Sequence, residues 1–156
     1  IDSAKDILDI AKNKSEKKNN KFIKWEVKDV LEIDDCSKKF DGICMSYGLR
    51  NLNNVEEGIK KVFYLLKNKG RAGFLDFHHS TKYSLPYIFQ KIYLRLVVVT
   101  ISRLFNLSKE YTYIEKSIEN FPKKNELMKI AKEVGFKKAE YKTIFYGQMG
   151  ILILFK

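Results

Sequence analysis

The spacing of apolar and polar residues in the first half of the chain predicts helices that alternate with short strands. Apolar positions recur at helical spacing in Ala4–Lys14 and in a segment that Asn53 or Asn54 begins and that runs to Lys67. Alternation of apolar and polar residues predicts a strand at Phe22–Val27, and short apolar runs predict two buried strands, at Asp41–Tyr47 and Arg71–Phe77. Because crossover-length segments separate the buried strands, this order indicates an α/β layered fold with a largely parallel sheet.

The second half of the chain predicts a different arrangement. Ser84–Leu107 is long and very apolar, and helices are expected at Tyr111–Asn120 and Asn125–Val134, the second ended by Gly135. Two closing strands, Lys138–Phe145 and Met149–Phe155, follow a helix directly, which favours an antiparallel addition to the sheet. With 156 residues, the pattern fits one domain over residues 1–156.

Charge and cysteine usage narrow the function classes. The net charge of +11 points to nucleic acid, an anionic membrane surface or an anionic small molecule as a partner. The lysine-rich run at 13–21 is equally typical of a solvated loop or helix end, and it lacks the interleaved aromatic residues of a single-strand binder, so no nucleic acid is expected. Cys36 and Cys44 form no CxxC pair and no zinc spacing with His78 and His79, so no metal site is expected.

The first residues and the most apolar stretch of the chain are where targeting and membrane-spanning signals are expected. The chain begins with Ile1 rather than Met and without a signal-peptide pattern, which is consistent with a processed, excised or incomplete chain. The most apolar stretch, Leu94–Leu107, carries Arg95 and Arg103 and is shorter than the roughly 20 residues of a spanning helix.

Polar residues gather where the predicted strands end, and ligands of open α/β sheets bind at that edge. Asp2 precedes the first helix, Asp29-Val30 follows the Trp25 strand, and Ser46-Tyr47 and Asp76-Phe77-His78 follow the next two strands. A carboxylate there suits ribose hydroxyls or an adenine amino group, although a lone Asp is also typical of a helix cap or turn.

Four segments carry a resemblance to a known family: SYGLRN at 46–51, LDFH at 75–78, EYTYIEKSIENFP at 110–122 and GQMGILILFK at 147–156. With them the chain resembles the ubiquinone/menaquinone C-methyltransferase family, most of all the cyanobacterial and plastid branch that methylates demethylphylloquinone. The resemblance implies a class I, Rossmann-like methyltransferase fold with a seven-stranded sheet, helices on both faces, and S-adenosylmethionine as the methyl donor. The family's first strand and glycine-rich loop are expected to precede residue 1, so the chain is expected to be an N-terminally truncated, C-terminal part that is inactive alone if the loop is essential.

The resemblance also implies roles for individual residues. The positions that match cofactor-binding residues are Asp2 for the ribose, Asp29 and Val30 beside the adenine, and Ser46. Arg50 and Asn51 match a polar pair that faces the methyl-transfer site, and Tyr47, Tyr111 and Tyr113 are expected to line the substrate pocket. In place of the family's usual Lys-Pro-Gly-Gly turn stands Lys67-Asn68-Lys69-Gly70, which indicates a looser turn.

The implied reaction moves a methyl group to a ring carbon of a reduced, prenylated naphthoquinol. Arg50 stays protonated and is expected to stabilise the oxyanion, whereas His78 is a candidate base or, equally, a helix-end histidine. Residues 84–122 are expected to form a lid over the prenyl tail, with peripheral membrane contact, in a cyanobacterial cytoplasm or a plastid; ordinary core packing is the other interpretation. A ubiquinone-pathway benzoquinol methyltransferase, an RNA methyltransferase and a non-catalytic domain that keeps the fold remain alternatives.

Overall fold

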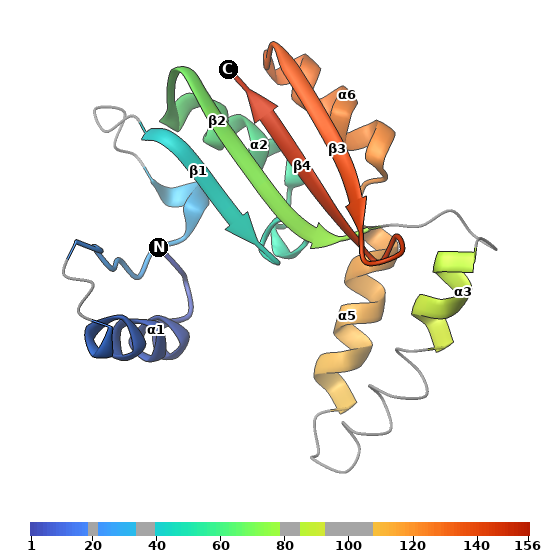
Figure 1. Cartoon of the computed structure of the whole chain (residues 1–156), viewed down its shortest axis with the longest axis horizontal. Helices are drawn as coiled ribbons and strands as arrows, with labels where there is room; N and C mark the ends of the chain where they lie inside the picture. Colours follow the sequence, from blue (N-terminus) through green and yellow to red (C-terminus); the bar gives the residue numbers. More distant parts are fainter. Residues whose placement is uncertain (19–21, 34–39, 79–84, 93–107) are drawn as a thin grey trace. The chain divides into compact units, whose positions relative to one another are not determined.

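A four-stranded mixed sheet organises the larger part of the chain, in the order β1-β2-β4-β3 (Figure 1). Its strands are β1 (Phe40–Ser46), β2 (Leu66–Phe77), β3 (Lys138–Ile144) and β4 (Met149–Phe155). This computed structural model describes residues 1–18, 22–33, 40–78, 85–92 and 108–156. They fall into two compact units, Ile1–Lys38 and Lys39–Lys156, each taken by itself below. One domain over 1–156 stays a prediction.

The sheet register confirms the predicted mixture of strand directions. β1 pairs parallel with β2, as Ser46 does with Leu75, whereas β4 pairs antiparallel with both β2 and β3. The crossover from β1 to β2 contains the 3-10 turn η2 (Leu49–Asn51) and helix α2 (Val55–Leu65). Because β1 and β2 are parallel, their carboxyl ends lie at the same edge of the sheet, and η2 begins there.

Local sequence signals account for where the helices begin and end. The Asn54 side chain accepts a hydrogen bond from the Glu57 amide at the start of α2, which confirms the predicted cap. Helix α6 (Lys124–Val134) ends at Gly135, whose φ of 113° is a conformation that glycine adopts without strain. Helix α5 (Ser108–Asn120) covers the predicted helix at 111–120.

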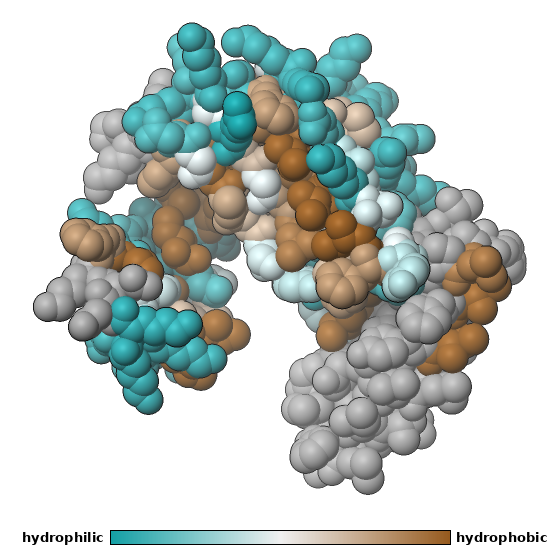
Figure 2. Space-filling model, in the orientation of Figure 1, coloured by the Kyte–Doolittle hydropathy of each residue, from teal (hydrophilic) through white to brown (hydrophobic). Residues whose placement is uncertain are grey.

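One face of the sheet packs against α2 and α6 and forms the core. The buried residues of this core are Leu49, Ile59, Val62, Leu66, Ala72, Phe74, Phe121, Leu127, Ala131, Phe136, Leu152 and Leu154. On the opposite face Leu75, Ile151 and Ile153 are only half-buried, and Figure 2 shows brown, apolar side chains along the sheet on that side. In the described part of this unit, the two helices that pack on the sheet therefore lie on one face.

The turn before β2 differs from the prediction. The helix ends at Leu65, and β2 already begins at Leu66, with an irregular register between Phe40 and Gly42 of β1. Lys69 takes a φ of 67°, so a non-glycine residue adopts the left-handed conformation within the 67–70 turn. This is the place where the chain has lysine in a turn that is usually rich in glycine.

The first unit contains α1 (Lys5–Lys17), as predicted, but no regular strand among its described residues. The predicted strand at Phe22–Val27 is wrong: it is reduced to an isolated parallel bridge between Asp2 and Val27. A strand forms only where a neighbouring backbone pairs with it, and within the described residues only the backbone at Asp2 pairs with this segment. Phe22 is 99% exposed.

The apolar segment at 84–107 is described only in part. Helix α3 (Leu85–Ile92) covers its start, and residues 84 and 93–107, together with His79 and Cys36, lie outside the described residues. Cys44 is an exposed free thiol. None of the helices in the described ranges is long and apolar enough to cross a membrane.

Candidate functional site

A sharp change of direction at Tyr47 begins the candidate site. The Tyr47 amide still donates to the Leu75 carbonyl, 2.8 Å away, and so continues the β1–β2 ladder. Tyr47 itself has a φ of 56°, which is unusual for a side chain of this size. The Asn51 side-chain amide donates to the Tyr47 carbonyl at 3.0 Å and holds the reversed chain in place. Arg50 and Asn51 thereby stand at the carboxyl ends of β1 and β2.

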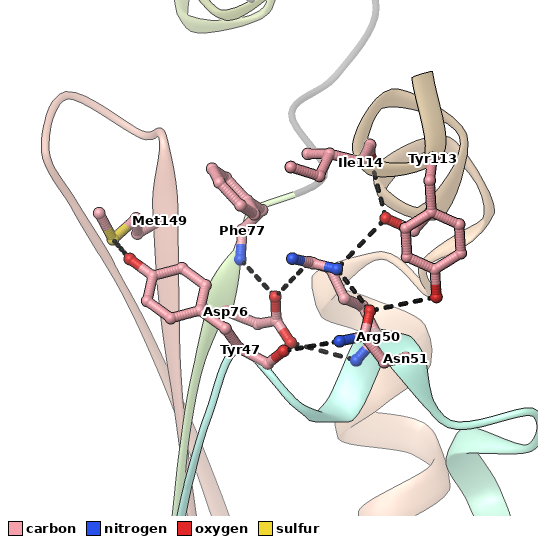
Figure 3. A network of polar contacts seen from close by, with 9 residues as sticks. Tyr47, Arg50, Asn51, Asp76, Phe77, Tyr113, Ile114 and Met149 are labelled. Carbon is pink, nitrogen blue, oxygen red and sulfur yellow. Dashed lines mark hydrogen bonds and ion pairs between the residues drawn. The ribbon is translucent and has the colours of Figure 1, made fainter. Parts of the chain in front are cut away.

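A buried ion pair fixes the Arg50 side chain (Figure 3). Arg50 Nε lies 3.0 Å from Asp76 Oδ1, and the two side chains are only 8% and 4% exposed. The Nε–H does not point along this line, so the contact is an ion pair rather than an aligned hydrogen bond. The Arg50 and Phe77 backbone amides donate to the two carboxylate oxygens at 3.1 and 2.9 Å. Asp76 therefore ties η2 to the end of β2.

Burial has a larger effect on the pKa of Asp76 than the attraction of Arg50 has. Desolvation raises the pKa of Asp76 from its ordinary 3.8, more than the two backbone amides and the Arg50 guanidinium lower it. A buried pair of this kind contributes little net stability, because desolvation cancels the attraction between the charges. What it does contribute is a guanidinium held in one position.

Helix α5 supplies the other wall of the polar network in Figure 3. Arg50 Nη1 donates to the Asn51 side-chain oxygen and, at 3.3 Å, to the Ser117 hydroxyl, which itself donates to the Ile114 carbonyl. The Tyr113 phenol donates to the same Asn51 oxygen at 3.4 Å. Because Tyr113 and Ser117 are four residues apart, they lie on one face of α5.

An apolar patch adjoins the guanidinium. The Tyr47 and Phe77 rings lie with centroids 5.5 Å apart, and the Tyr47 phenol is 3.1 Å from the Met149 sulfur. The Arg50 guanidinium carbon lies 5.4 Å from the Phe77 ring centroid. Aromatic side chains beside a cation and several hydrogen-bonding groups suit a flat ring that carries oxygen substituents.

His78 is held separately, at the end of β2. Its ring Nδ1 lies 2.9 Å from the phenol of Tyr141, on β3. Burial, and after it the negative charge of Asp76, raise the pKa of that phenol to about 12. His78 is thus part of a second polar contact rather than of the Arg50 network.

The first unit brings two of the predicted cofactor-binding acids close in the fold. The bridge sets Asp2 beside Val27, two residues before Asp29. Each carboxylate accepts from a backbone amide at the start of the next helix, Asp2 from Ala4 at 2.9 Å and Asp29 from Leu31 at 2.8 Å. Val30 begins the short helix η1 (Val30–Glu32). A carboxylate has room for further donors, so capping and ribose binding are compatible.

The structure thus gathers four of the predicted residues, Tyr47, Arg50, Asn51 and Tyr113, in one network, with Ser46 at the adjoining end of β1. Tyr111 lies on α5, but its side chain is outside the described residues. The prediction placed Asp76 at the ligand-binding edge without giving it a role, and it omitted Ser117 and Tyr141. Asp76 is the one acid in an apolar strand, which was a usable signal, whereas the partners of Ser117 and Tyr141 are distant in sequence.

Comparison with known proteins decides the family. The family model of the ubiE/COQ5 methyltransferase family matches residues 1–156. The chain belongs to the ubiE/COQ5 methyltransferase family. This confirms the predicted family, a methyltransferase family that uses S-adenosylmethionine. The chain is 34% identical to the 2-phytyl-1,4-naphtoquinone methyltransferase of Nostoc punctiforme, over all of this chain and 68% of that protein.

The chain is also similar to a chloroplastic protein and to several solved structures. It is 35% identical to the chloroplastic 2-phytyl-1,4-beta-naphthoquinone methyltransferase of Arabidopsis thaliana, over 85% of this chain and 51% of that one. A SAM-dependent methyltransferase from Aquifex aeolicus matches with a TM-score of 0.64 at 11% identity, over 98% of this chain and 65% of its own. The citrinin polyketide synthase CMeT domain matches with a TM-score of 0.62 at 11% identity, covering 97% of this chain and 36% of that one. These structures confirm the class I methyltransferase fold.

Proposed function

We propose that this ubiE/COQ5 family member transfers a methyl group from S-adenosylmethionine to a ring carbon of a prenylated naphthoquinol, with reduced 2-phytyl-1,4-naphthoquinone as the substrate that its relatives suggest. The observation that carries the proposal is the Arg50 guanidinium, which Asp76 holds beside the Tyr47–Phe77 aromatic pair. The same chemistry serves a menaquinone precursor, because only the tail differs.

Reaction at a ring carbon requires that electron density reach that carbon. A quinol carbon becomes a good nucleophile when the neighbouring hydroxyl gives up its proton, and the resulting oxyanion then needs a fixed positive partner. Arg50 fits this role because its guanidinium stays protonated and its orientation is set by Asp76, Asn51 and Ser117. Tyr47 and Phe77 would hold the ring, and Tyr113 would orient it through Asn51.

The residues of the first unit fit the adenosine part of the cofactor. Asp2 is bridged in parallel to Val27, and Asp29 lies two residues further on, which suits one acid that accepts from ribose hydroxyls and a second that lies beside the adenine. Val30 would pack on the adenine. The bound cofactor supplies an electrophilic methyl group on a sulfonium.

Helix α3 supports contact with the lipid tail or with the bilayer that contains it. Leu85, Ile88 and Ile92 are 83%, 44% and 51% exposed, and their spacing of three and four places them on one side of the helix. We therefore place residues 84–122 over the tail, with peripheral membrane contact in a cyanobacterial or plastid setting. Serine at all three positions should weaken binding to anionic liposomes, and the matched control places serine at Ile7 and Ile10, two exposed apolar residues of α1; equal binding by all variants contradicts this part.

A panel of methyl acceptors tests the proposed reaction. The chain is incubated with S-adenosylmethionine labelled in its methyl group and, separately, with the reduced naphthoquinone, the oxidised naphthoquinone, a prenylated benzoquinol and RNA. We expect label in the ring of the reduced naphthoquinone and none from the oxidised form, since the quinone carbon is not nucleophilic. Label in the benzoquinol alone indicates the ubiquinone pathway, and label in RNA alone indicates an RNA methyltransferase. No label together with no calorimetric heat from the cofactor indicates a non-catalytic domain only if a longer chain that includes the family's glycine-rich loop gives the same result; activity of the longer chain alone shows that this part is inactive by itself.

A further inference from the structure

His78 is held by the β3–β4 hairpin at two points. Its backbone amide donates to the Gln148 carbonyl at 2.9 Å, and its ring Nδ1 lies 2.9 Å from the Tyr141 phenol oxygen. The two rings are 5.5 Å apart between centroids and inclined by 51°. Both the position and the ring orientation of His78 therefore depend on residues more than sixty positions away in the chain.

Gly150 makes the contact between β3 and β2 possible. Tyr141 lies opposite Leu152 of β4, and its ring runs diagonally over Gly150 toward the end of β2. A Cβ at position 150 would overlap the phenol oxygen and the ring carbon that bears it. The absence of a side chain at this position is thus what lets a β3 phenol reach a β2 imidazole.

The direction of the hydrogen bond follows from the chemistry of the two groups. The phenol keeps its proton throughout the pH range of the imidazole, because burial and the charge of Asp76 raise its pKa to about 12. An imidazole nitrogen accepts more strongly than a phenol oxygen, so the phenol O–H donates to Nδ1. Among the described residues, the other charged groups near the pair are Lys124 of α6, 6.0 Å from the Tyr141 ring centroid, and Arg50, which balances Asp76.

We infer that Tyr141 is a positioning residue that holds neutral His78 in the tautomer with its proton on Nε2. A neutral imidazole that accepts at Nδ1 and carries a proton on Nε2 has no lone pair left to take another proton. In this tautomer the ring of His78 acts as a hydrogen-bond donor through Nε2 and not as a general base. The link to methyl transfer rests on the proposed function, but the tautomer does not.

Nitrogen-15 NMR of the two histidine rings in the full chain tests the inference without any assay of activity. A His79→Asn variant assigns the signals of His78. We expect an unprotonated Nδ1 and a protonated Nε2 in a single tautomer. In Tyr141→Phe we expect signals that average over both tautomers, and protonation of His78 at a higher pH, since an imidazolium cannot accept from the phenol.

Two further variants make the outcome decisive. Tyr146→Phe removes a hydroxyl from a 96% exposed tyrosine of the same hairpin and should leave the His78 signals unchanged. Gly150→Ala displaces the phenol while keeping it, and should reproduce the Tyr141→Phe spectrum; Tyr141→Phe decides the question by itself if that variant does not fold. A protonated Nδ1 in the wild type, or His78 signals and titration unaffected by Tyr141→Phe, overturns the inference. Because the tautomer is read directly, failure here is distinct from failure of methyl transfer.

Discussion

Substitution of Asp76 by asparagine separates the positioning role of the buried ion pair from any stabilising role. The wild-type carboxylate contacts Phe77 N at 2.9 Å, Arg50 Nε at 3.0 Å and Arg50 N at 3.1 Å. Asparagine keeps one oxygen, so one of these donors faces an NH₂ group instead. The guanidinium meanwhile loses its only ion-pair partner in the described part of the chain.

The magnitude follows from burial. Asp76 is 3% exposed, and its raised pKa means that the folded chain already favours a neutral side chain at this position, so loss of the charge itself costs little. The cost of Asp76→Asn is then that of one buried donor that faces the new NH₂ group, about 1–3 kcal/mol. At roughly 2–4 °C per kcal/mol for a chain of this size, the melting temperature should fall by about 5 °C.

Urea unfolding followed by far-ultraviolet circular dichroism measures this cost, because the signal reports the sheet rather than the single Trp25 of the first unit. A paired Arg50→Met, Asp76→Leu variant should return to within about 1 kcal/mol of the wild type, since no buried charge then remains. A mild effect of Asp76→Asn, below about 1 kcal/mol, would refute the reasoning, as would a double variant that is less stable than the single one.

The difference in stability between the wild type and the double variant should change with pH in one direction. The folded-state pKa of Asp76 is raised, so the folded chain takes up this proton before the unfolded chain does. The contribution of Asp76 to stability is therefore fully present below its unfolded pKa and is lost as the pH rises through its folded pKa. Relative to the double variant, which lacks the carboxyl, the wild type should gain stability when a neutral solution is acidified.

Three further substitutions test the local structure, each by the same unfolding measurement. Lys69→Gly should stabilise the chain by roughly 0.5–1 kcal/mol, because Lys69 has a φ of 67°; destabilisation would show that the turn is not left-handed. Gly135→Ala should cost about 1 kcal/mol, since the φ of 113° at the end of α6 strains any side chain; a neutral result would contradict this. Lys156→Met should cost about 1–2 kcal/mol, because the ammonium donates to the Phe63 and Leu66 carbonyls at the end of α2; unchanged stability would show that these contacts contribute nothing.

Periodicity predicted the elements whose stability comes from their own sequence. Asn54 and Gly135 mark helix ends through local backbone geometry, and such signals need no knowledge of distant residues. The last strand, predicted at Met149–Phe155, has these bounds in the structure, and its burial alternates, with Leu152 and Leu154 inside. These features were correctly placed to within a few residues.

The errors fall where distant parts of the chain decide the structure. Phe22–Val27 has the composition of a strand, but among the residues that the structure describes only the backbone at Asp2 pairs with it. The role of Tyr141 could not be predicted either, because its contact with His78 depends on the space that Gly150 leaves on the neighbouring strand. The sequence placed Arg50 at the edge of the sheet correctly, yet its pairing with Asp76, 26 residues later, follows from strand register.

The rate of methyl transfer by Arg50→Lys is the most direct test of the proposed site. Lysine keeps the charge and can still pair with Asp76, but it lacks the planar array of donors that reaches Asn51 and Ser117. With labelled S-adenosylmethionine and the reduced naphthoquinone, kcat should fall about a hundredfold while the KM for the cofactor stays the same. A wild-type chain that transfers methyl to this quinol, and an Arg50→Lys variant that does so equally fast, would contradict the assignment of Arg50 to the methyl-transfer site.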